Sequence, residues 1–319
     1  MTLIRNTSAP RAAMDSSAAR PGIPVTLAPG LRRILAPNPS AMTLHGTNTY
    51  LIGTRGLAVV DPGPDDRAHL AAILSAIGPD QQTTHILVTH AHLDHSPLAR
   101  RLSTLTGAKV LAYGDAAAGR SAIMRELAAT AEQGSGIGGG EGVDTRFAPD
   151  ICLADGALVQ GDDWQIEALW TPGHFGNHMC FAWGDTILSG DLVMGWATSL
   201  VSPPDGDMSD YMASCRRLAS RKPRVLHPGH GAPVSAPTDR IDAILAHRAA
   251  RETAILKALR RRPSDAATLA AALYTETPAA LMPAAARSVL AHLVDLTHKN
   301  QASPRGHLHA EAVFRCADG

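Results

Sequence analysis

Thr89-His90-Ala91-His92-Leu93-Asp94-His95 places four side chains that can ligate a metal ion within six residues. The segment directly follows the apolar run Ile86-Leu87-Val88, which predicts a buried strand. The ligands are therefore expected on the loop that leaves the C-terminal end of a strand, where α/β folds place their chemistry. Imidazole and carboxylate groups together are typical of sites for zinc or a similar divalent ion. A chance cluster of exposed histidines is the alternative, and three later segments count against it.

Each of these later segments places one ligand-type residue on a glycine-bearing turn after a predicted strand. The segments are Thr171–His174, Ser189–Asp191 and His227–Gly231, and their ligand-type residues are His174, Asp191 and His230. Glycine allows the backbone to turn sharply and to come close to a metal. One such turn would be weak evidence, but four comparable sites in chain order predict one shared metal centre.

In these residues the chain resembles the metallo-β-lactamase superfamily, in its binuclear metallo-hydrolase form. The family's His-x-His-x-Asp-His signature and its later single ligands match His90, His92, Asp94, His95, His174, Asp191 and His230. The resemblance covers roughly residues 40 to 235. The family often continues with Gly-Gly two residues past the motif, where this chain has Pro97-Leu98. Proline is acceptable in the first turn of a helix, so the site is expected to tolerate this departure.

The resemblance implies two divalent metal ions, with zinc as the first expectation. It assigns the first ion to His90, His92 and His174, the second to Asp94, His95 and His230, and the bridging position to Asp191. Two such ions about 3.5–4 Å apart need a bridging carboxylate to offset their repulsion, and they lower the pKa of a shared water towards ~7. Asp94 and Asp191 are thus the carboxylates expected to be catalytic. Manganese and iron stay open, because affinity alone rarely sets the metal in vivo.

Asp61, in Asp61-Pro62-Gly63, closes the strand expected at 56–60. By resemblance it would accept an N–H from a ligating histidine and fix its tautomer, and a simple turn is the alternative. His178 and His227 lie next to ligand segments. They are expected to be structural, because the seven ligand positions are already filled.

Strand and helix patterns alternate in both halves of the chain. Strands are expected at about 43–53, 56–60, 84–89, 109–112, 164–170, 178–183, 186–189 and 224–227, and helices at 65–77, 96–106 and 208–220. Two β-rich halves with outer helices predict an α/β fold, an αββα sandwich. The resemblance implies the same metallo-β-lactamase fold, with the metals at one edge between the sheets. Residues 114–150 break the pattern, and Gly134–Gly140 is expected to be a mobile flap. A phosphate cradle fits badly there, because no strand precedes it and no Lys-Ser/Thr follows.

From Pro237 the composition shifts to helix formers. Helices expected at 239–261, 266–273 and 284–298, followed by an apolar stretch at 310–314, predict a mainly helical, winged-helix-like C-terminal domain. The expected organisation is a disordered tail over 1–22, a metallo-β-lactamase-like domain over 23–236, and the helical domain over 237–319.

The C-terminal domain is mildly basic. From 238 to 319 it has 11 Lys and Arg against 8 Asp and Glu, a net charge of +3. Nucleic-acid footprints are usually far more basic. A small packing or dimerisation module, which would make the protein a homodimer, is therefore an equal alternative to an RNA contact.

The composition limits the partners and the cellular location that are expected for the protein. The formal net charge is +0, so nothing global calls for a nucleic acid or a membrane surface. Apolar runs are expected to stay short of transmembrane length, and the first 22 residues lack the apolar region of a secretory signal. We therefore expect a cytoplasmic protein with no membrane partner, and an organelle transit peptide is the alternative. The four widely spaced cysteines do not predict a disulfide framework.

The predicted site indicates metal-assisted hydrolysis but leaves the bond open. The first reading is hydrolysis of a small-molecule ester, thioester or related bond. The alternative is a single-stranded-RNA endoribonuclease, because the chain most resembles small β-lactamase-like endoribonucleases with a winged-helix tail. That resemblance includes Asn177-His178-Met179, Asp210-Tyr211-Met212 and Pro228–Gly231. A metal-stabilised, DNA-binding regulator is disfavoured, since seven ligands are more than a structural zinc needs.

Overall fold

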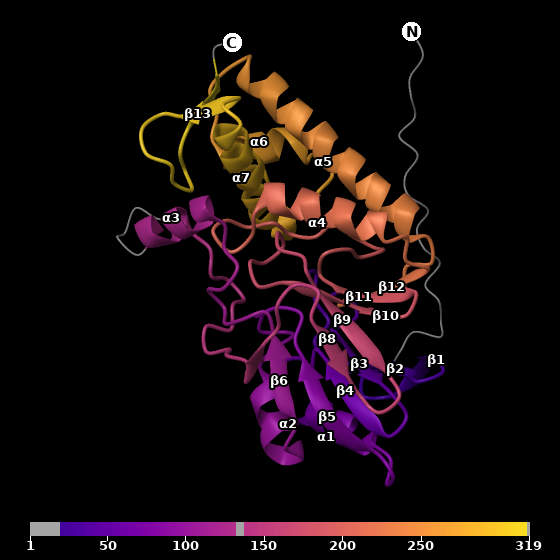
Figure 1. Ribbon diagram of the computed structural model, residues 1–319. Coiled ribbons are helices and arrows are strands. Elements are labelled where there is room, and N and C mark those ends of the chain that lie inside the picture. Colours follow the sequence, from indigo (N-terminus) through magenta and orange to yellow (C-terminus); the bar gives the residue numbers. More distant parts are fainter. Residues whose placement is uncertain (1–19, 132–136, 318–319) are drawn as a thin grey trace.

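The computed structural model of the protein describes residues 20–131 and 137–317. Two β-sheets pack face to face in the lower half of the molecule (Figure 1). The first sheet has the strand order β1-β2-β3-β4-β5-β6-β7, with β1 Val25–Ala28, β2 Leu31–Leu35, β3 Asn48–Ile52, β4 Gly56–Val60, β5 Gln82–Leu87, β6 Lys109–Ala112 and β7 Ile151–Cys152. The second has the order β12-β11-β10-β9-β8, with β8 Leu158–Gln160, β9 Gln165–Trp170, β10 Met179–Trp183, β11 Thr186–Gly190 and β12 Val225–Pro228.

The sheets form the two inner layers of a four-layer sandwich. Val60 and Leu87 of the first sheet share one buried cluster with Phe181 and Leu188 of the second. Helices α1 (Arg67–Ser75) and α2 (Leu98–Thr106) cover the outer face of the first sheet, and α4 (Met208–Ser220) and the first half of α5 (Pro237–Leu259) cover that of the second. Strands β3, β4 and β11 are therefore buried at every position. The predicted αββα sandwich is confirmed.

The topology brings four loops to one edge of the sandwich. Strand β4 pairs parallel with β5, and β11 pairs parallel with β12. The C-terminal ends of parallel strands meet at the same edge of a sheet, where α/β folds bind ligands. Asp61 follows β4, the segment His90–His95 follows β5, Asp191 follows β11 and His230 follows β12. The predicted ligand segments thus converge because of strand direction.

A helical unit at the top of Figure 1 follows the sandwich. It contains the second half of α5, α6 (Ala266–Leu273), η1 (Ala279–Leu281), α7 (Met282–His298) and the antiparallel pair β13 (Ala302–Pro304) and β14 (Phe314–Cys316). Ile255, Leu269, Leu293 and Phe314 share its buried core. The three helices agree with the predicted ones to within about two residues. Strand β13 was not predicted, and β14 begins at residue 314, the end of the apolar stretch expected at 310–314.

The domain boundary at 236–237 stays a prediction, because α5 belongs to both parts. Ile241 and Ile244, near the start of α5, pack in the cluster of the second sheet, whereas Ile255 and Leu259 pack in the core of the helical unit. Of the predicted N-terminal tail, residues 1–19 lie outside the described residues. Gly22, at its end, donates to the Leu35 carbonyl oxygen.

The hairpin β1–β2 is a finding that the sequence analysis missed. Its strands pair antiparallel around Pro29-Gly30, where Gly30 has φ +74°. A Pro-Gly pair between two short apolar runs is a turn signal that could have revealed it.

The segment 114–150 packs against the helical unit. Its helix α3 (Ala122–Ala131) contributes Met124 and Leu127 to that unit's core, and Ile137 is fully buried in the same cluster. The Gly140 N–H donates to Asp205 at 2.7 Å. Residues 137–140 are thus anchored by contacts, in contrast to the mobile flap that the sequence predicts. The other part of that flap, 134–136, lies outside the described residues.

Within the part of the chain that the structure describes, one helical stretch, Ala279–His298, is long and apolar enough to span a membrane, with a mean hydropathy of 1.3. No run of that length was expected from the sequence. Half of the stretch is buried, and Val289 and Leu293 lie in the core of the helical unit. A buried core helix meets the same criterion, so the stretch is weak evidence for a membrane contact.

Candidate metal centre

Three histidines form one side of the convergent cluster. His90 and His92 lie on the loop after β5, and His174 lies on the loop after β9. His90 Nε2 is 2.9 Å from His92 Nδ1, and His174 Nε2 is 3.2 Å from the same atom. Ring nitrogens at such distances repel one another unless a proton or a cation lies between them, so these three could share one metal ion.

Asp94, His95 and His230 form the other side. His95 Nε2 is 3.4 Å from Asp94 Oδ2 and 3.4 Å from His230 Nε2. His230 Nε2 is 3.2 Å from Asp94 Oδ2. The Thr47 hydroxyl donates to the same carboxylate oxygen at 3.2 Å. Two imidazoles and a carboxylate thus meet at a second point.

Asp191 lies between the two groups. Its Oδ1 is 3.6 Å from His95 Nε2, and its Oδ2 is 3.2 Å from His230 Nε2 and 3.9 Å from His174 Nε2. The carboxylate therefore reaches ligands of both sides, as a bridging group must. All seven predicted ligands are brought into one cluster, and their role in binding metal stays a prediction.

The electrostatics of the two sides differ. Burial lowers the pKa of His92 to about 3, and it also lowers the pKa values of His90 and His174. Burial acts to lower the pKa of His230 as well, but Asp191 and Asp94 raise it to about 10. Burial would raise the pKa of Asp191, yet His230 and His95 hold it well below its usual value. His90, His92 and His174 are therefore neutral imidazoles. On the other side of the cluster, Asp94 and Asp191 favour positive charge.

Asp61 orients the metal loop from behind. His95 Nδ1 donates to Asp61 Oδ2 at 2.9 Å, so His95 Nε2 faces the cluster. The backbone N–H and hydroxyl of Thr89 donate to the same carboxylate at 2.7 and 2.8 Å. Asp61 is 2% exposed and has φ +50°, a left-handed conformation that costs free energy in a non-glycine residue and is found at functional sites. The predicted contact of Asp61 with a ligating histidine is confirmed.

Backbone groups orient the remaining ligands, and the sequence gives no sign of them. His174 Nδ1 donates to the Leu200 carbonyl oxygen at 2.6 Å, and His230 Nδ1 donates to that of Gly46 at 3.2 Å. The Asp191 N–H donates to His178 Nε2 at 3.2 Å. His178 therefore supports Asp191 and is not part of the donor cluster, in agreement with its predicted structural role.

Glycine is required where the loops approach the carboxylate. A Cβ on Gly229 would lie 2.3 Å from Asp191 Oδ1 and 2.7 Å from His95 Cε1. Gly190 has φ +47°, and a Cβ there would lie 2.6 Å from His178 Nε2. These contacts are too short for any other residue without displacement of the cluster.

Exposed apolar side chains lie on the loops around the cluster, and these loops are called its rim below. Among the described residues, seven large hydrophobic side chains are exposed, and three of them, Met42, Leu93 and Trp196, lie on loops that carry or flank the ligands. Leu93 is part of the metal loop, and Trp196 lies against Gly231, next to His230. The rim of the cluster thus has an apolar character.

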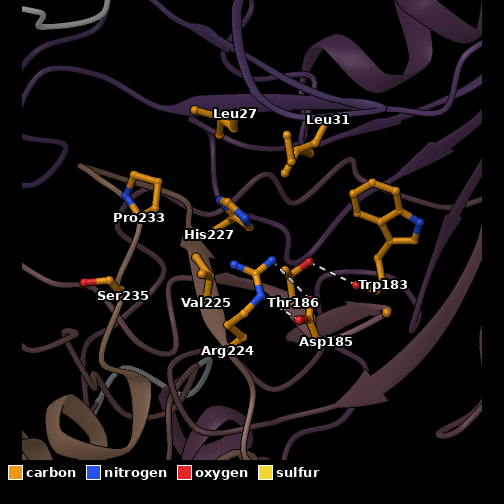
Figure 2. Close-up of a pocket in the computed structure, with 12 residues that line it drawn as sticks. Leu27, Leu31, Trp183, Asp185, Thr186, Arg224, Val225, His227, Pro233 and Ser235 are labelled. Atoms are coloured by element: carbon orange, nitrogen blue, oxygen red, sulfur yellow. Dashed lines mark hydrogen bonds and ion pairs between the residues drawn. The ribbon is translucent and has the colours of Figure 1, made fainter.

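A second hollow lies apart from the cluster. A cavity of about 450 Å³ lies between the β1–β2 hairpin and the turn between β10 and β11, and none of the seven donors lines it (Figure 2). Leu27, Leu31 and Trp183 form apolar walls, and an ion pair of 2.6 Å joins Arg224 to Asp185. His227, 5% exposed, also lines this cavity. It is therefore not a ligand, as the sequence predicts.

The cluster fits two divalent cations. Within the described residues, three overlapping sets of donor atoms, each within 4.8 Å of one another, could hold a metal ion: His90, His92 and His174; His90, His95 and Asp191; Asp94, His95 and His230. Asp191 Oδ1 is buried and has no hydrogen-bond partner among these residues, an arrangement that costs free energy unless a cation is bound. The donors are nitrogen and oxygen atoms only, which suits zinc and similar ions.

Comparison with known proteins agrees with this geometry. A family model described as the metallo-beta-lactamase superfamily matches residues 42–230, and one described as a beta-lactamase associated winged helix domain matches residues 266–306. The chain is 31% identical to a beta-lactamase-like protein 2 homolog of Drosophila melanogaster, over 83% of this chain and 86% of that protein. It is 27% identical to an atrochrysone carboxyl ACP thioesterase of Aspergillus fumigatus, over 81% and 74%.

A solved structure gives the same picture. The crystal structure of a metallo-beta-lactamase family protein from Thermus thermophilus superposes with a TM-score of 0.73 at 25% identity, and the match covers 91% of this chain and all of that one. The predicted winged-helix-like tail is confirmed by the second family model. With its sandwich fold, its cluster of histidines and aspartates and its winged-helix domain, the chain belongs to the metallo-beta-lactamase superfamily of hydrolases.

Proposed function

We propose that the protein is a binuclear, zinc-dependent hydrolase that cleaves a small-molecule ester or thioester with an apolar group next to the scissile bond. The observation that carries this proposal is the position of Asp191 between two groups of donors. Two cations close together need a carboxylate at such a position to offset their repulsion.

The ligand set gives each residue a role. His90, His92 and His174 would hold one cation, Asp94, His95 and His230 the other, and Asp191 both. Divalent ions held there would supply Lewis-acid chemistry, that is, a lowered pKa for a coordinated water and polarisation of a carbonyl group. The side chain of Asp94 is 27% exposed, whereas those of His95, His230 and Asp191 are at most 10% exposed. This exposure supports Asp94 as the carboxylate that would accept a proton from the attacking water.

The rim of the cluster favours an apolar substrate group. Met42, Leu93 and Trp196 are 46%, 49% and 38% exposed, and burying such side chains against a ligand is favourable. One relative of this chain is named an atrochrysone carboxyl ACP thioesterase. Both the apolar rim and the thioesterase relative support an acyl thioester whose acyl part packs against these three residues.

Single-stranded RNA is the second candidate substrate. A groove of about 500 Å³ on the helical unit, between α5 and α6, is lined by Lys257, Arg261 and Arg262. Basic side chains along a groove attract a phosphate backbone. This groove supports an endoribonuclease, whereas the apolar rim supports a hydrolase of small esters or thioesters.

A direct comparison of substrates decides between the two. The zinc-loaded protein and its Asp191→Ala variant are assayed with aliphatic and aromatic acyl-CoA thioesters and with a labelled single-stranded RNA. Thioester cleavage by the native protein alone, faster for acyl groups with larger apolar surface, supports the proposal. RNA cleavage by the native protein without thioester turnover overturns it in favour of the endoribonuclease. Binding of duplex DNA without any turnover would indicate the regulator.

A further inference from the structure

The loop from Asp191 to Asp207 joins β11 to α4 and carries two parts of the metal cluster. Asp191 is its first residue, and the Leu200 carbonyl oxygen accepts the N–H of His174. The loop is irregular over its whole length. Buried carbonyl groups of such a loop lack the partners that a helix or a sheet would supply, so side chains must donate to them.

Three arginines of the C-terminal helices supply these donors. Arg240 of α5 donates to the carbonyl oxygens of Met194 and Ala197 at 2.7 and 2.6 Å. Arg248 of α5 donates to that of Ser199. Arg287 of α7 donates to the Ser202 hydroxyl at 2.8 Å and to the Pro203 carbonyl oxygen. These three residues are called the arginine clamp below.

Arg248 is the central member of the clamp. Its side chain is 2% exposed, and its guanidinium group lies 5.2 Å from the centre of the Tyr211 ring. Its Nε has no hydrogen-bond partner among the described residues. A buried cation costs free energy, and an apolar side chain at this position would be cheaper for packing α5 alone. The contact with Ser199 is therefore the feature that accounts for an arginine at this position.

The residues that the arginine clamp holds are in direct contact with Asp191 and His174, or with the residue next to Asp191. The Ser199 hydroxyl donates to the Asp191 carbonyl oxygen, and the Tyr211 hydroxyl donates to that of Leu192 at 3.0 Å. Leu200 lies between Ser199 and Ser202, which Arg248 and Arg287 hold from either side. Since Leu200 fixes the Nδ1 proton of His174, the clamp determines where His174 Nε2 points.

We infer that the C-terminal helices are a working part of the metal centre, and that Arg248, supported by Arg240 and Arg287, is a positioning residue for Asp191 and His174. The inference rests on the proposed metal centre but not on the identity of the substrate. It gives α5 and, through Arg287, the winged-helix domain a structural role at the site that requires no nucleic acid. Loss of a residue behind a metal ligand typically weakens metal binding about 10–100-fold.

The test compares zinc binding by four proteins: the native chain, Arg248→Met, Arg248→Lys, and the matched control Arg260→Met. Arg260 is exposed at the end of the same helix. Zinc affinity is measured by competition with a chromophoric chelator, and ligand geometry by the visible absorption spectrum of the cobalt(II)-loaded protein. Thermal unfolding of the metal-free proteins reports any general loss of stability.

The inference predicts that Arg248→Met binds zinc about 10–100-fold more weakly and has an altered cobalt spectrum. Arg248→Lys should recover part of the affinity, because an ammonium group can still donate to Ser199, and Arg260→Met should match the native protein. A folded Arg248→Met variant with native affinity and spectrum would overturn the inference.

A second variant covers failure of Arg248→Met to fold. Arg287 is only partly buried, so Arg287→Met removes the contacts with Ser202 and Pro203 with less risk to the core. The Arg287→Met substitution should also alter the spectrum of the cobalt-loaded protein. A spectrum identical to that of the native protein would contradict the role of the arginine clamp. If the native protein itself binds fewer than two zinc ions, the proposed metal centre is wrong. If the native protein binds two zinc ions and the variants bind them equally well, only the role of the arginine clamp is wrong.

Discussion

The two loops that supply most of the ligands are held in different ways. The loop Thr89–His95 is fixed from within the sandwich, by Asp61 of the neighbouring strand end. The loop that begins at Asp191 is fixed from outside, by the arginine clamp on α5 and α7. Both follow a strand of a parallel pair, so the fold places them alike. The difference indicates that one half of the site is self-supporting, whereas the other half depends on the C-terminal helices.

Removal of the Asp191 carboxylate should have the largest effect, because Asp191 lies near donors of both sides of the cluster. Asp191→Ala is expected to lose one metal ion and, since a metal contributes several kcal/mol to catalysis, to reduce turnover roughly 10³-fold or more while the protein stays folded. Metal content by mass spectrometry and turnover of the zinc-loaded protein check this. Asp185→Ala is the control, since that carboxylate is 62% exposed. Two metal ions and full turnover in Asp191→Ala would refute the site.

Loss of the support behind the first loop should have the next largest effect. Asp61 accepts on both oxygens, from the Thr89 N–H on Oδ1 and from the Thr89 hydroxyl and His95 Nδ1 on Oδ2, whereas the amide of Asp61→Asn has one acceptor oxygen and turns its NH2 group towards at least one of these donors. We expect zinc to bind about 10–100-fold more weakly. Titration with a competing chelator measures the change, against the exposed control Asp80→Asn. If the effect of Asp61→Asn is no larger than that of Asp80→Asn, the loop does not depend on Asp61.

A methyl group placed between the loops tests their close approach. Gly229→Ala would put a Cβ 2.3 Å from Asp191 Oδ1, so the carboxylate or the backbone must move. Overpacking of this kind typically costs about 1–3 kcal/mol of unfolding free energy. Urea unfolding measures it. Gly195→Ala is the matched control, because its Cβ would come no closer than 3.4 Å to the nearest side-chain atom. Equal stability of the two variants would show that the approach is looser than described.

The basic groove should give the smallest effect. Lys257→Ala combined with Arg261→Ala removes two exposed cations that line it. Turnover of a thioester should be unchanged, because the groove is not part of the metal cluster. If the groove binds single-stranded RNA, the slope of log affinity against log salt should fall by about 1.4 for the two lost charges. A slope identical to that of the native protein would remove the groove as an RNA contact.

The self-supporting half is also the half that the sequence could predict. His90–His95 is a contiguous motif after an apolar strand, so residue types alone indicated it. The role of Asp61 was expected from the family resemblance of the turn that carries it. Single ligands such as His174 could be placed because a glycine turn and the family resemblance marked them. The strands and helices of the sandwich followed from apolar periodicity, with ends displaced by a few residues.

The contacts that support the other loop could not be predicted, although its ligand Asp191 could, and the reason is physical. The clamp joins arginines to main-chain carbonyl oxygens that lie 43 to 49 residues away for Arg240 and Arg248, and 84 residues away for Arg287. A carbonyl acceptor exists at every residue, so no sequence pattern marks the partner. The same holds for Leu200 and Gly46, which orient His174 and His230 through their backbones.

The most direct test of the account is anomalous X-ray diffraction at the zinc absorption edge from crystals of the zinc-loaded protein. The account predicts two zinc peaks, one among His90, His92 and His174 and one among Asp94, His95 and His230, with Asp191 in contact with both. A single peak, or a second peak away from Asp94, His95 and His230, would contradict a binuclear centre bridged by Asp191.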